Sequence, residues 1–383
     1  MLRLSLALLA SILPQPQPAV QPTDVPAFTI AIDGPIYAGQ PVWIRAVDGT
    51  RNANIRYPFS SDLGYMGCNR LEVKRNGLLL TPRKLPLRPL AGLACGSSAP
   101  RGSPENRLPL HVLYPIHEAG TYSVRWTEEG PSIEDGKFRM QTKAQSEWLT
   151  FTVHETTPEQ QEAWLKNLLA KPPQDDGQLA GEFLPSLMAA APDPRALNTF
   201  MKYVYSDNGV VSGIAASALE VFPQPEILRA VAESLEKNGP SEELAYFASY
   251  HTGWTLDDQD KIVHAATPYL QPRYSVLPTG TSLRPFAPTQ TSAAIKMLGF
   301  IFYVPNHAWP SNPELRSYAD AQILQAAPNL MANAGLSAVH ELAIYLGSME
   351  FSPRTHQLLL QIAERSDDAG EQARICLKWH PQP

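Results

Sequence analysis

The sequence lacks the residue patterns that usually carry enzymatic chemistry. Its 383 residues include nine histidines and three cysteines, and none of these shows the spacing of a metal-ligand set. His340-Glu341 begins a zinc-protease helix motif, but Ile344 stands where the second histidine is needed. No glycine-rich phosphate loop is present either. We therefore predict no enzymatic activity, and no catalytic, cofactor-binding or metal-binding residues.

Three short matches to functional motifs have simpler explanations. Residues 234–237 read Ser-x-x-Lys and residues 206–208 read Ser-Asp-Asn, two elements of penicillin-binding enzymes. Their order is reversed, no Lys-Thr-Gly follows, and amphipathic helices already account for both. Asp257, Asp258 and Asp260 resemble a divalent-ion cluster, but acidic residues at a helix start complement the helix dipole. An enzyme with dispersed active-site residues is the remaining catalytic alternative.

Long apolar segments are missing except at the N-terminus. Arg3 precedes an apolar run over residues 4–13, which Pro14 ends. A run of this length is typical of a secretory signal peptide and too short for a membrane span, which needs roughly 20 residues. We predict a signal peptide over residues 1–19, no membrane span, and export to the periplasm or the extracellular space. A buried N-terminal strand or helix is the alternative.

The predicted export indicates the oxidation state of the three cysteines. Cys68 and Cys95 lie in the first half of the chain, and Cys376 stands alone near the C-terminus. An oxidising compartment favours a Cys68–Cys95 disulfide and a buried Cys376 thiol. Two unpaired buried thiols are the alternative for the first two.

The pattern of the sequence changes at residues 156–158. Before this point, short alternating apolar runs are broken by Gly, Pro and Asn, which indicates strands; after it, Ala- and Leu-rich segments repeat with a helical period. Residues 1–154 carry 16 Lys and Arg against 12 Asp and Glu, while residues 155–383 carry 15 against 25. We predict a β domain over residues 24–154 and an α-helical domain over residues 157–383. The acidic helical part disfavours nucleic acid as a partner.

The first domain is predicted to be an antiparallel β-sandwich. Asn76-Gly77 is the strongest hairpin signal in it, because both residues of a type I′ turn need positive φ. The long basic stretch over residues 82–107 is interpreted as a solvated loop, and contact with an acidic partner or with the acidic second domain is the alternative. The expected strands cover residues 28–32, 42–46, 71–75, 78–80, 111–114, 122–127 and 148–153.

A short motif in this domain resembles immunoglobulin-like domains. Residues 116–124 contain Gly120-Thr121-Tyr122, similar to the turn whose corner tyrosine returns its hydroxyl to the backbone. Val124 holds the position at which antibody domains keep a cysteine. The resemblance implies an Ig-like sandwich and carries no functional content. A carbohydrate-binding or peptidase-inhibitor sandwich therefore stays open.

Helix starts in the second domain are marked by a capping residue before proline, which fits the first helical turn because its missing N–H is not needed there. Thr157 also has Gln160 three residues on, which completes a capping box. The four such pairs are Thr157-Pro158, Asp193-Pro194, Asn312-Pro313 and Ser352-Pro353.

Residues 207–219 begin with Asp207-Asn208, continue into an Ala-Ala-Ser-Ala-Leu face, and are followed by Pro223 and a second helix from Glu226. This stretch resembles a HEAT-type repeat, and residues 366–383 echo it. The resemblance implies a HEAT-like α-helical solenoid in which small residues let stacked helix pairs approach. An irregular helical array is the alternative.

Two proline-rich interruptions of the helical pattern are the predicted binding loops. Residues 271–289 carry Tyr274 and Phe286, and residues 303–313 carry His307 and Trp309. Long loops in helical arrays often lie on the binding face, although such side chains also pack beneath their own loops. We predict an exported non-enzymatic interaction scaffold with a protein or peptide partner. The second hypothesis is a carbohydrate-binding or peptidase-inhibitor sandwich carried on a helical domain.

Overall fold

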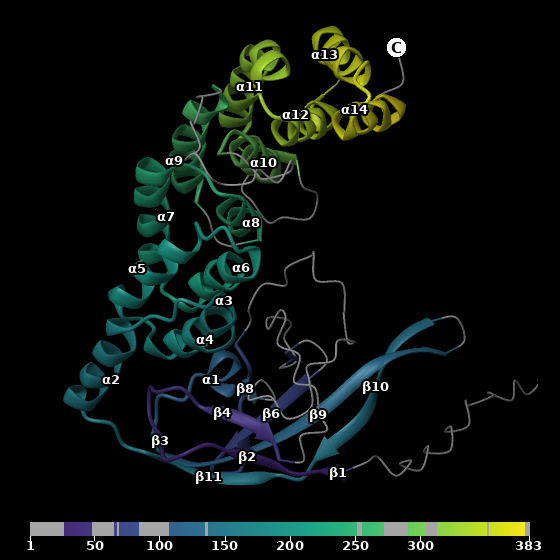
Figure 1. The fold of residues 1–383 in the computed structure, drawn as a ribbon. Coiled ribbons are helices and arrows are strands. Elements are labelled where there is room, and N and C mark those ends of the chain that lie inside the picture. Colours follow the sequence, from purple (N-terminus) through teal and green to yellow (C-terminus); the bar gives the residue numbers. More distant parts are fainter. Residues whose placement is uncertain are drawn as a thin grey trace, which may run out of the picture.

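The computed structural model describes residues 27–47, 65–66, 69–83, 107–134, 137–250, 255–271, 290–303, 312–350 and 352–379. The N-terminal part is rich in sheet and the C-terminal part is mostly helical (Figure 1). The last strand ends at His154 and the next helix begins at Pro158, which confirms the predicted change from strands to helices. The predicted signal peptide over residues 1–19 lies outside the described residues, as do Cys68 and Cys95.

The described strands form two sheets. One has the order β1-β10-β9-β11-β3, with β6 also paired to β9 and joined by β5 and β7; the other has the order β2-β4-β8. Most pairs are antiparallel, but β1 runs parallel to β10 and β3 parallel to β11. The strands are β1 Ala27–Phe28, β2 Ile30–Ile32, β3 Ile36–Tyr37, β4 Trp43–Ala46, β5 Tyr65–Met66, β6 Asn69–Arg75, β7 Leu78–Leu79, β8 Arg107–Pro109, β9 Gly120–Glu134, β10 Lys137–Ser146 and β11 Leu149–His154.

The prediction of a purely antiparallel arrangement is therefore wrong at these two pairs. Each is only two residues long in register, at the rim of the larger sheet. β1 and β3 belong to the larger sheet, and β2 between them belongs to the smaller one, so the chain crosses between the sheets here. The direction in which a strand arrives after such a crossing cannot be predicted from the alternation of apolar residues along that strand. The Ig-like assignment stays a prediction.

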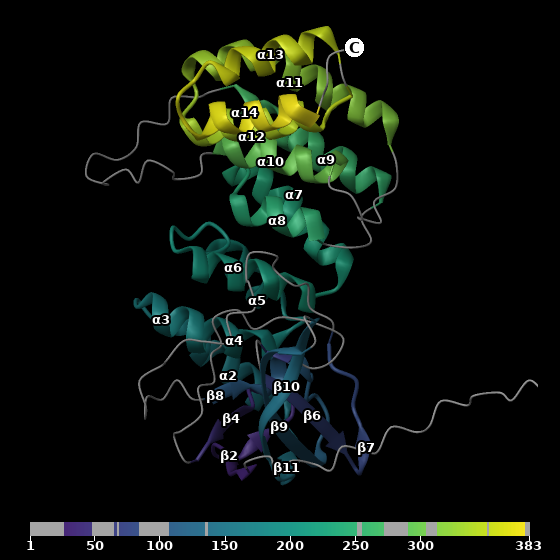
Figure 2. The same ribbon diagram turned by 90° about the vertical axis from the view of Figure 1, so that its right-hand side faces the viewer.

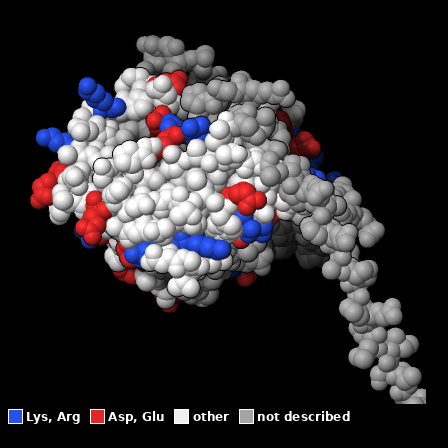
Figure 3. Space-filling model, turned by 90° about the horizontal axis from the view of Figure 1, so that it is seen from below, with Lys and Arg blue, Asp and Glu red and all other residues white. Residues whose placement is uncertain are grey.

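Buried side chains from both sheets belong to one hydrophobic core. Trp126 of β9, Leu71 of β6 and Ile44 of β4 are fully buried, and the Phe28 ring meets Trp126 edge-on at 5.5 Å. The face of this part seen from below shows acidic and basic side chains interspersed among wide uncharged areas (Figure 3). The mild basic excess of the sequence is thus not gathered into one patch on this face.

Two predicted local features of the sheets are confirmed. Asn76 and Gly77 have positive φ, 49° and 81°, and the pairing of Lys74 with Leu79 closes the hairpin around them. The Tyr122 hydroxyl donates to the carbonyl of Glu118 at 2.9 Å, as the corner-tyrosine resemblance implies. The first feature fixes a strand register, and the second fixes the entry into β9.

The strand predicted over residues 111–114 is wrong, because Leu110–Leu113 forms a single helical turn, α1. All four residues are buried, so no exposed alternate positions exist to mark a strand. The Tyr114 amide donates to the Leu110 carbonyl at 3.0 Å, and the Leu110 amide donates to Val42 of the adjacent segment at 2.9 Å. The turn thus satisfies its backbone groups inside the core.

The helical part begins at the predicted capping box. Thr157 Oγ1 accepts from the Gln160 amide, and Gln160 Oε1 accepts from the Thr157 amide at 3.0 Å. Helices also start at Pro194, Pro313 and Pro353 behind the side-chain caps Asp193, Asn312 and Ser352, which confirms all four predicted starts. The helices are α2 Pro158–Ala170, α3 Asp176–Gln178, α4 Leu184–Leu187, α5 Pro194–Tyr203, α6 Gly209–Ala218, α7 Gln224–Asn238, α8 Glu242–Tyr250, α9 Leu256–Ala266, α10 Gln290–Tyr303, α11 Pro313–Asn333, α12 Leu336–Ser348, α13 Pro353–Ala363 and α14 Asp368–Trp379, with a π-helical turn at Leu179–Phe183 and 3₁₀ turns at Met188–Ala190, Leu219–Val221 and Thr267–Leu270.

From α4 onward, alternate helices form two rows. In one row α4, α6, α8, α10, α12 and α14 contact one another in that order; in the other, α5, α7, α9, α11 and α13 do the same. The rows curve together, with the first on the inner side of the curve (Figure 1) and facing the viewer in Figure 2. The two segments that echo each other in sequence form α6 and α14, both in the inner row. The HEAT assignment itself stays a prediction.

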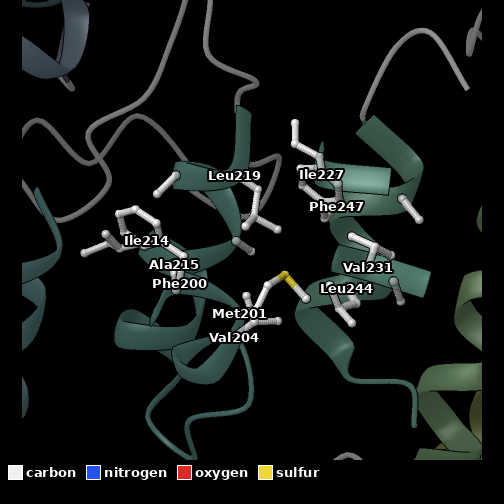
Figure 4. Close-up of a cluster of buried hydrophobic side chains, with 14 of the residues drawn as sticks. Phe200, Met201, Val204, Ile214, Ala215, Leu219, Ile227, Val231, Leu244 and Phe247 are labelled. Atoms are coloured by element: carbon white, nitrogen blue, oxygen red, sulfur yellow. The ribbon is translucent and has the colours of Figure 1, made fainter. Parts of the chain in front are cut away.

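Apolar and small side chains fill the space between the rows. Phe200 and Met201 of α5 meet Ala215 of α6 and residues of the next two helices, Val231 and Leu244, in one buried cluster (Figure 4). Ala215 and Leu244 have no exposed surface. Each helix therefore buries its apolar face only through its neighbours on both sides.

The sheets and the helices share a buried seam around His111. Its Nδ1 accepts from the Val42 amide at 3.0 Å, and its Nε2 lies 2.7 Å from the carbonyl of Pro185 in α4. Nδ1 also lies 3.1 Å from the Val42 carbonyl. The shorter contact of Nε2 with a carbonyl, which only accepts, favours a proton on Nε2, and burial keeps the ring neutral by lowering its pKa. Next to it, Arg107 of β8 pairs with Glu182 at 2.9 Å. The sheet-rich part and the helical part therefore share one hydrophobic core.

We predict that His111 makes the fold acid-sensitive. Burial lowers its pKa from 6.5 to about 4, so the unfolded chain binds a proton there before the folded chain does. Stability present above pH 6.5 is lost as the pH falls toward 4, by on the order of 3 kcal/mol. Urea unfolding of the wild type and His111→Gln between pH 7 and pH 4 measures it. Equal pH slopes for the two proteins would contradict the assignment.

The close approach of α12 and α14 depends on Gly347. A Cβ built there would lie 2.7 Å from Cys376 Cβ, whereas one at Gly299 of α10 would meet only Tyr345 Cδ2, at 3.5 Å. Cys376 is buried, as predicted, at 8% exposure. We expect Gly347→Ala to destabilise by roughly 1–3 kcal/mol despite the higher helix propensity of alanine. Gly299→Ala, the matched control, should be neutral or stabilising in the same thermal unfolding experiment.

Candidate binding groove

The predicted binding residues Tyr274, Phe286, His307 and Trp309 all lie outside the described residues, and so does the predicted Cys68–Cys95 disulfide. Both predictions therefore stay predictions. The candidate site that the described residues do form lies elsewhere, in the outer row of helices.

An open groove of about 540 Å³ runs between α5 and α7. Its base is formed by Met201 and by the half-buried Ala230. Polar side chains from both helices surround this apolar base. The full lining is Asn198, Met201, Lys202, Tyr205, Ala230, Glu233, Ser234, Lys237 and Asn238.

The sequence of the two helices explains which side chains reach the groove. Asp193 caps α5, and Ala196, Leu197, Phe200 and Met201 form its buried face. Asn198 and Lys202 are therefore turned to the exposed edge of the helix, four residues apart. Met201 belongs to both environments, because it also packs in the buried cluster beneath the groove (Figure 4).

A hydrogen-bonded network fixes one end of the groove. The Tyr205 hydroxyl donates to the carbonyl of Gly239 at 2.8 Å and accepts from Ser234 Oγ at 3.1 Å. Ser234 Oγ accepts in turn from Asn238 Nδ2 at 3.2 Å. Burial raises the pKa of Tyr205 to about 12, so the phenol stays protonated. This network holds the C-terminal ends of α5 and α7 side by side.

The same network explains the Ser-x-x-Lys match. Ser234 is bonded to Tyr205 and Asn238, and no hydrogen bond joins it to Lys237 in the part of the chain that the structure describes. Ser234 is also buried, at 8% exposure. The serine thus has a structural role at this position.

The charged groups of the groove are held less firmly. Lys202, Glu233 and Lys237 are exposed, and none of the three makes an ion pair within 4.0 Å among the described residues. By contrast, Lys296 of α10 lies 2.8 Å from Glu242 and 3.4 Å from Glu341, and Lys261 lies 2.7 Å from Asp257. The groove therefore presents two ammonium groups and one carboxylate to solvent.

Two other polar clusters of the helical part are hydrogen-bonded internally. Asp320 accepts hydrogen bonds from Tyr303 at 2.7 Å and Tyr345 at 2.9 Å, and burial raises the pKa of both tyrosines. Ser292 and Ser337 bond each other between α10 and α12 at 2.8 Å. These contacts join neighbouring helices. Over the described ranges, no three metal-ligating side chains come together.

A scan against protein-family models and searches of curated proteins and of solved structures found no match for this chain. Among the helices that the structure describes, none has the length and apolar character to cross a membrane. What the chain binds is therefore inferred from its own geometry.

Only some features of the groove could be predicted from the sequence. The exposed positions on α5 and α7 follow from helical periodicity, and both lysines are visible in the last turns of these helices. Which two helices lie side by side is a matter of tertiary packing, since a whole helix separates α5 from α7 in the chain. The sequence pattern indicated binding at the two proline-rich loops, residues 271–289 and 303–313, instead.

We predict that the Tyr205 hydroxyl is needed to hold the groove. Tyr205→Phe leaves the Gly239 carbonyl without its donor and the Ser234 hydroxyl without its acceptor, at a cost of about 1–2 kcal/mol. Tyr203→Phe is the control, because that half-buried hydroxyl makes no hydrogen bond with any described residue. Chemical denaturation of both variants tests this, and equal losses would contradict the role of the network.

Proposed function

We propose that this protein is an exported, non-enzymatic scaffold that binds a segment of a partner protein in the groove between α5 and α7. The observation that carries the proposal is the combination of an open groove, an apolar base and exposed charged groups on both sides that make no ion pair among the described residues. The Lys202 ammonium lies 5.5 Å from the centre of the Tyr203 ring. The volume of about 540 Å³ is within the usual range of ligand sites, roughly 300–1,000 Å³.

The chemistry of the lining suits a peptide. The Asn198 amide carries both a donor and an acceptor, and the Asn238 amide keeps its Oδ1 and one N–H beside the bond that it donates to Ser234. Such groups match the alternating N–H and C=O groups of an extended backbone. Met201 is an adaptable apolar surface for a side chain of the bound segment. An arrangement of this kind can orient a ligand, which supports a binding role.

For the second hypothesis, a carbohydrate-binding or peptidase-inhibitor sandwich, Trp148 is an aromatic side chain on which a sugar could stack. Trp148 is half-buried beside the polar face of β6, β9 and β11. Lys74 Nζ lies 4.0 Å and the Arg125 guanidinium 4.8 Å from the centre of its ring. A sugar would have to displace these cations to stack there, so this observation favours the groove.

Selection of random peptides by display on the full-length chain tests the proposal. We expect enriched peptides to bind the wild type and to lose at least tenfold in affinity with Ala230→Arg, which fills the base of the groove. Ala321→Arg is the matched control, an exposed alanine on the outer-row helix α11.

Two results would contradict the proposed function. One is a selection that yields no peptide with saturable binding. The other is a set of peptides whose affinity falls equally with Ala230→Arg and Ala321→Arg, because binding would then not depend on the groove.

A further inference from the structure

The inference concerns the class of segment that the groove accepts, and it rests on the proposed function. The groove has a positive excess within an acidic part of the chain. Residues 155–383 carry 15 Lys and Arg against 25 Asp and Glu, yet the groove is lined by two lysines and one glutamate. Its local charge is thus opposite in sign to that of its surroundings.

The two lysines approach the groove from opposite sides. Lys202 is in the last turn of α5, and Lys237 is in the last turn of α7. The Tyr205 hydroxyl bonds to Gly239, which directly follows α7, so these two helix ends lie next to each other. Both ammonium groups therefore belong to the same end of the groove, above the fixed Tyr205–Ser234 network.

Complementation of the helix dipole accounts for part of this placement. A lysine in the last turn of a helix gains roughly 0.3–1 kcal/mol from the negative end of the dipole. That effect does not require two lysines on one groove, and it leaves their ammonium groups without a carboxylate partner. Elsewhere in the helical part, Lys261 and Lys296 lie within 4.0 Å of a carboxylate, whereas the exposed Lys166, Lys171 and Lys378 make no such pair among the described residues. What distinguishes Lys202 and Lys237 is therefore that both line one groove.

We propose that the groove binds an extended acidic segment of a partner protein, with side-chain carboxylates paired to Lys202 and Lys237. The Asn198 and Asn238 amides would contact its backbone, and Met201 would contact an apolar side chain between the acidic residues. Charges farther away contribute little, because the screening length is about 8 Å at physiological ionic strength. The net acidity of the helical part therefore does not prevent binding at the groove.

Three fluorescent decapeptides with amidated C-termini test the inference: alternating serine and glutamate, serine and glutamine, and serine and lysine. Fluorescence anisotropy with the full-length protein should show the glutamate peptide binding about tenfold more tightly than the glutamine peptide. Lys202→Gln and Lys237→Gln should each weaken it about threefold, and the double variant about tenfold. The preference should diminish as salt is added.

Two further variants separate a local site from bulk charge. Lys378→Gln removes an exposed lysine from α14 and should leave binding unchanged. The double variant Lys202→Glu, Lys237→Glu should favour the lysine peptide over the glutamate peptide. Thermal unfolding of each variant reports any loss of the dipole contribution independently of binding.

The inference is overturned if the glutamate peptide does not bind, if both neutral and acidic peptides bind equally, or if Lys378→Gln weakens binding as much as the groove variants. A glutamine peptide with a free C-terminus that binds as well as the acidic one would identify a terminal carboxylate as the ligand and also overturn it. Display-selected peptides that depend on Ala230 but lack acidic preference would leave the proposed function standing. A failed selection would remove both.

Discussion

Close approach between neighbouring helices is the constraint on which the rest of the helical part depends. Each helix is too narrow to bury its apolar face alone, so Phe200, Ala215 and Leu244 of three different helices share one cluster. Where helices come nearest, only a hydrogen atom fits, as at Gly347 against Cys376. Hydrogen bonds between side chains, such as Ser292–Ser337, then fix how one helix is aligned with the next.

The groove is a product of the same packing. Two outer-row helices that lie side by side leave a furrow wherever the facing side chains are small or turned aside, and Ala230 is small. The buried hydroxyl of Tyr205 closes one end by linking residues of both segments. The long charged side chains then have no room in the core and extend into solvent around the furrow. A site for a partner thus arises without any residue departing from good helical geometry.

Sequence reasoning predicted the local features well, because their causes are local. Capping pairs such as Asn312-Pro313 and the Asn76-Gly77 turn are decided by a few neighbouring residues. The ribbon of β9 and β10 was not predicted, although Asp135-Gly136 between them is a recognised hairpin signal. The helical turn at Leu110–Leu113 could not be predicted from the sequence, because four consecutive buried residues show no periodic pattern. The groove, finally, depends on which helices become neighbours, and no local pattern states that.

The seam at His111 has a consequence for how the chain can be divided. Leu184 and Leu187 have no exposed surface in the intact molecule, and they belong to the helix whose Pro185 carbonyl accepts a hydrogen bond from His111 Nε2. Cutting the chain at residue 156 would divide this shared hydrophobic core and would remove the Pro185 carbonyl from His111. We therefore expect that neither part folds independently and that the separate fragments aggregate. The intact molecule is the natural unit for biochemistry.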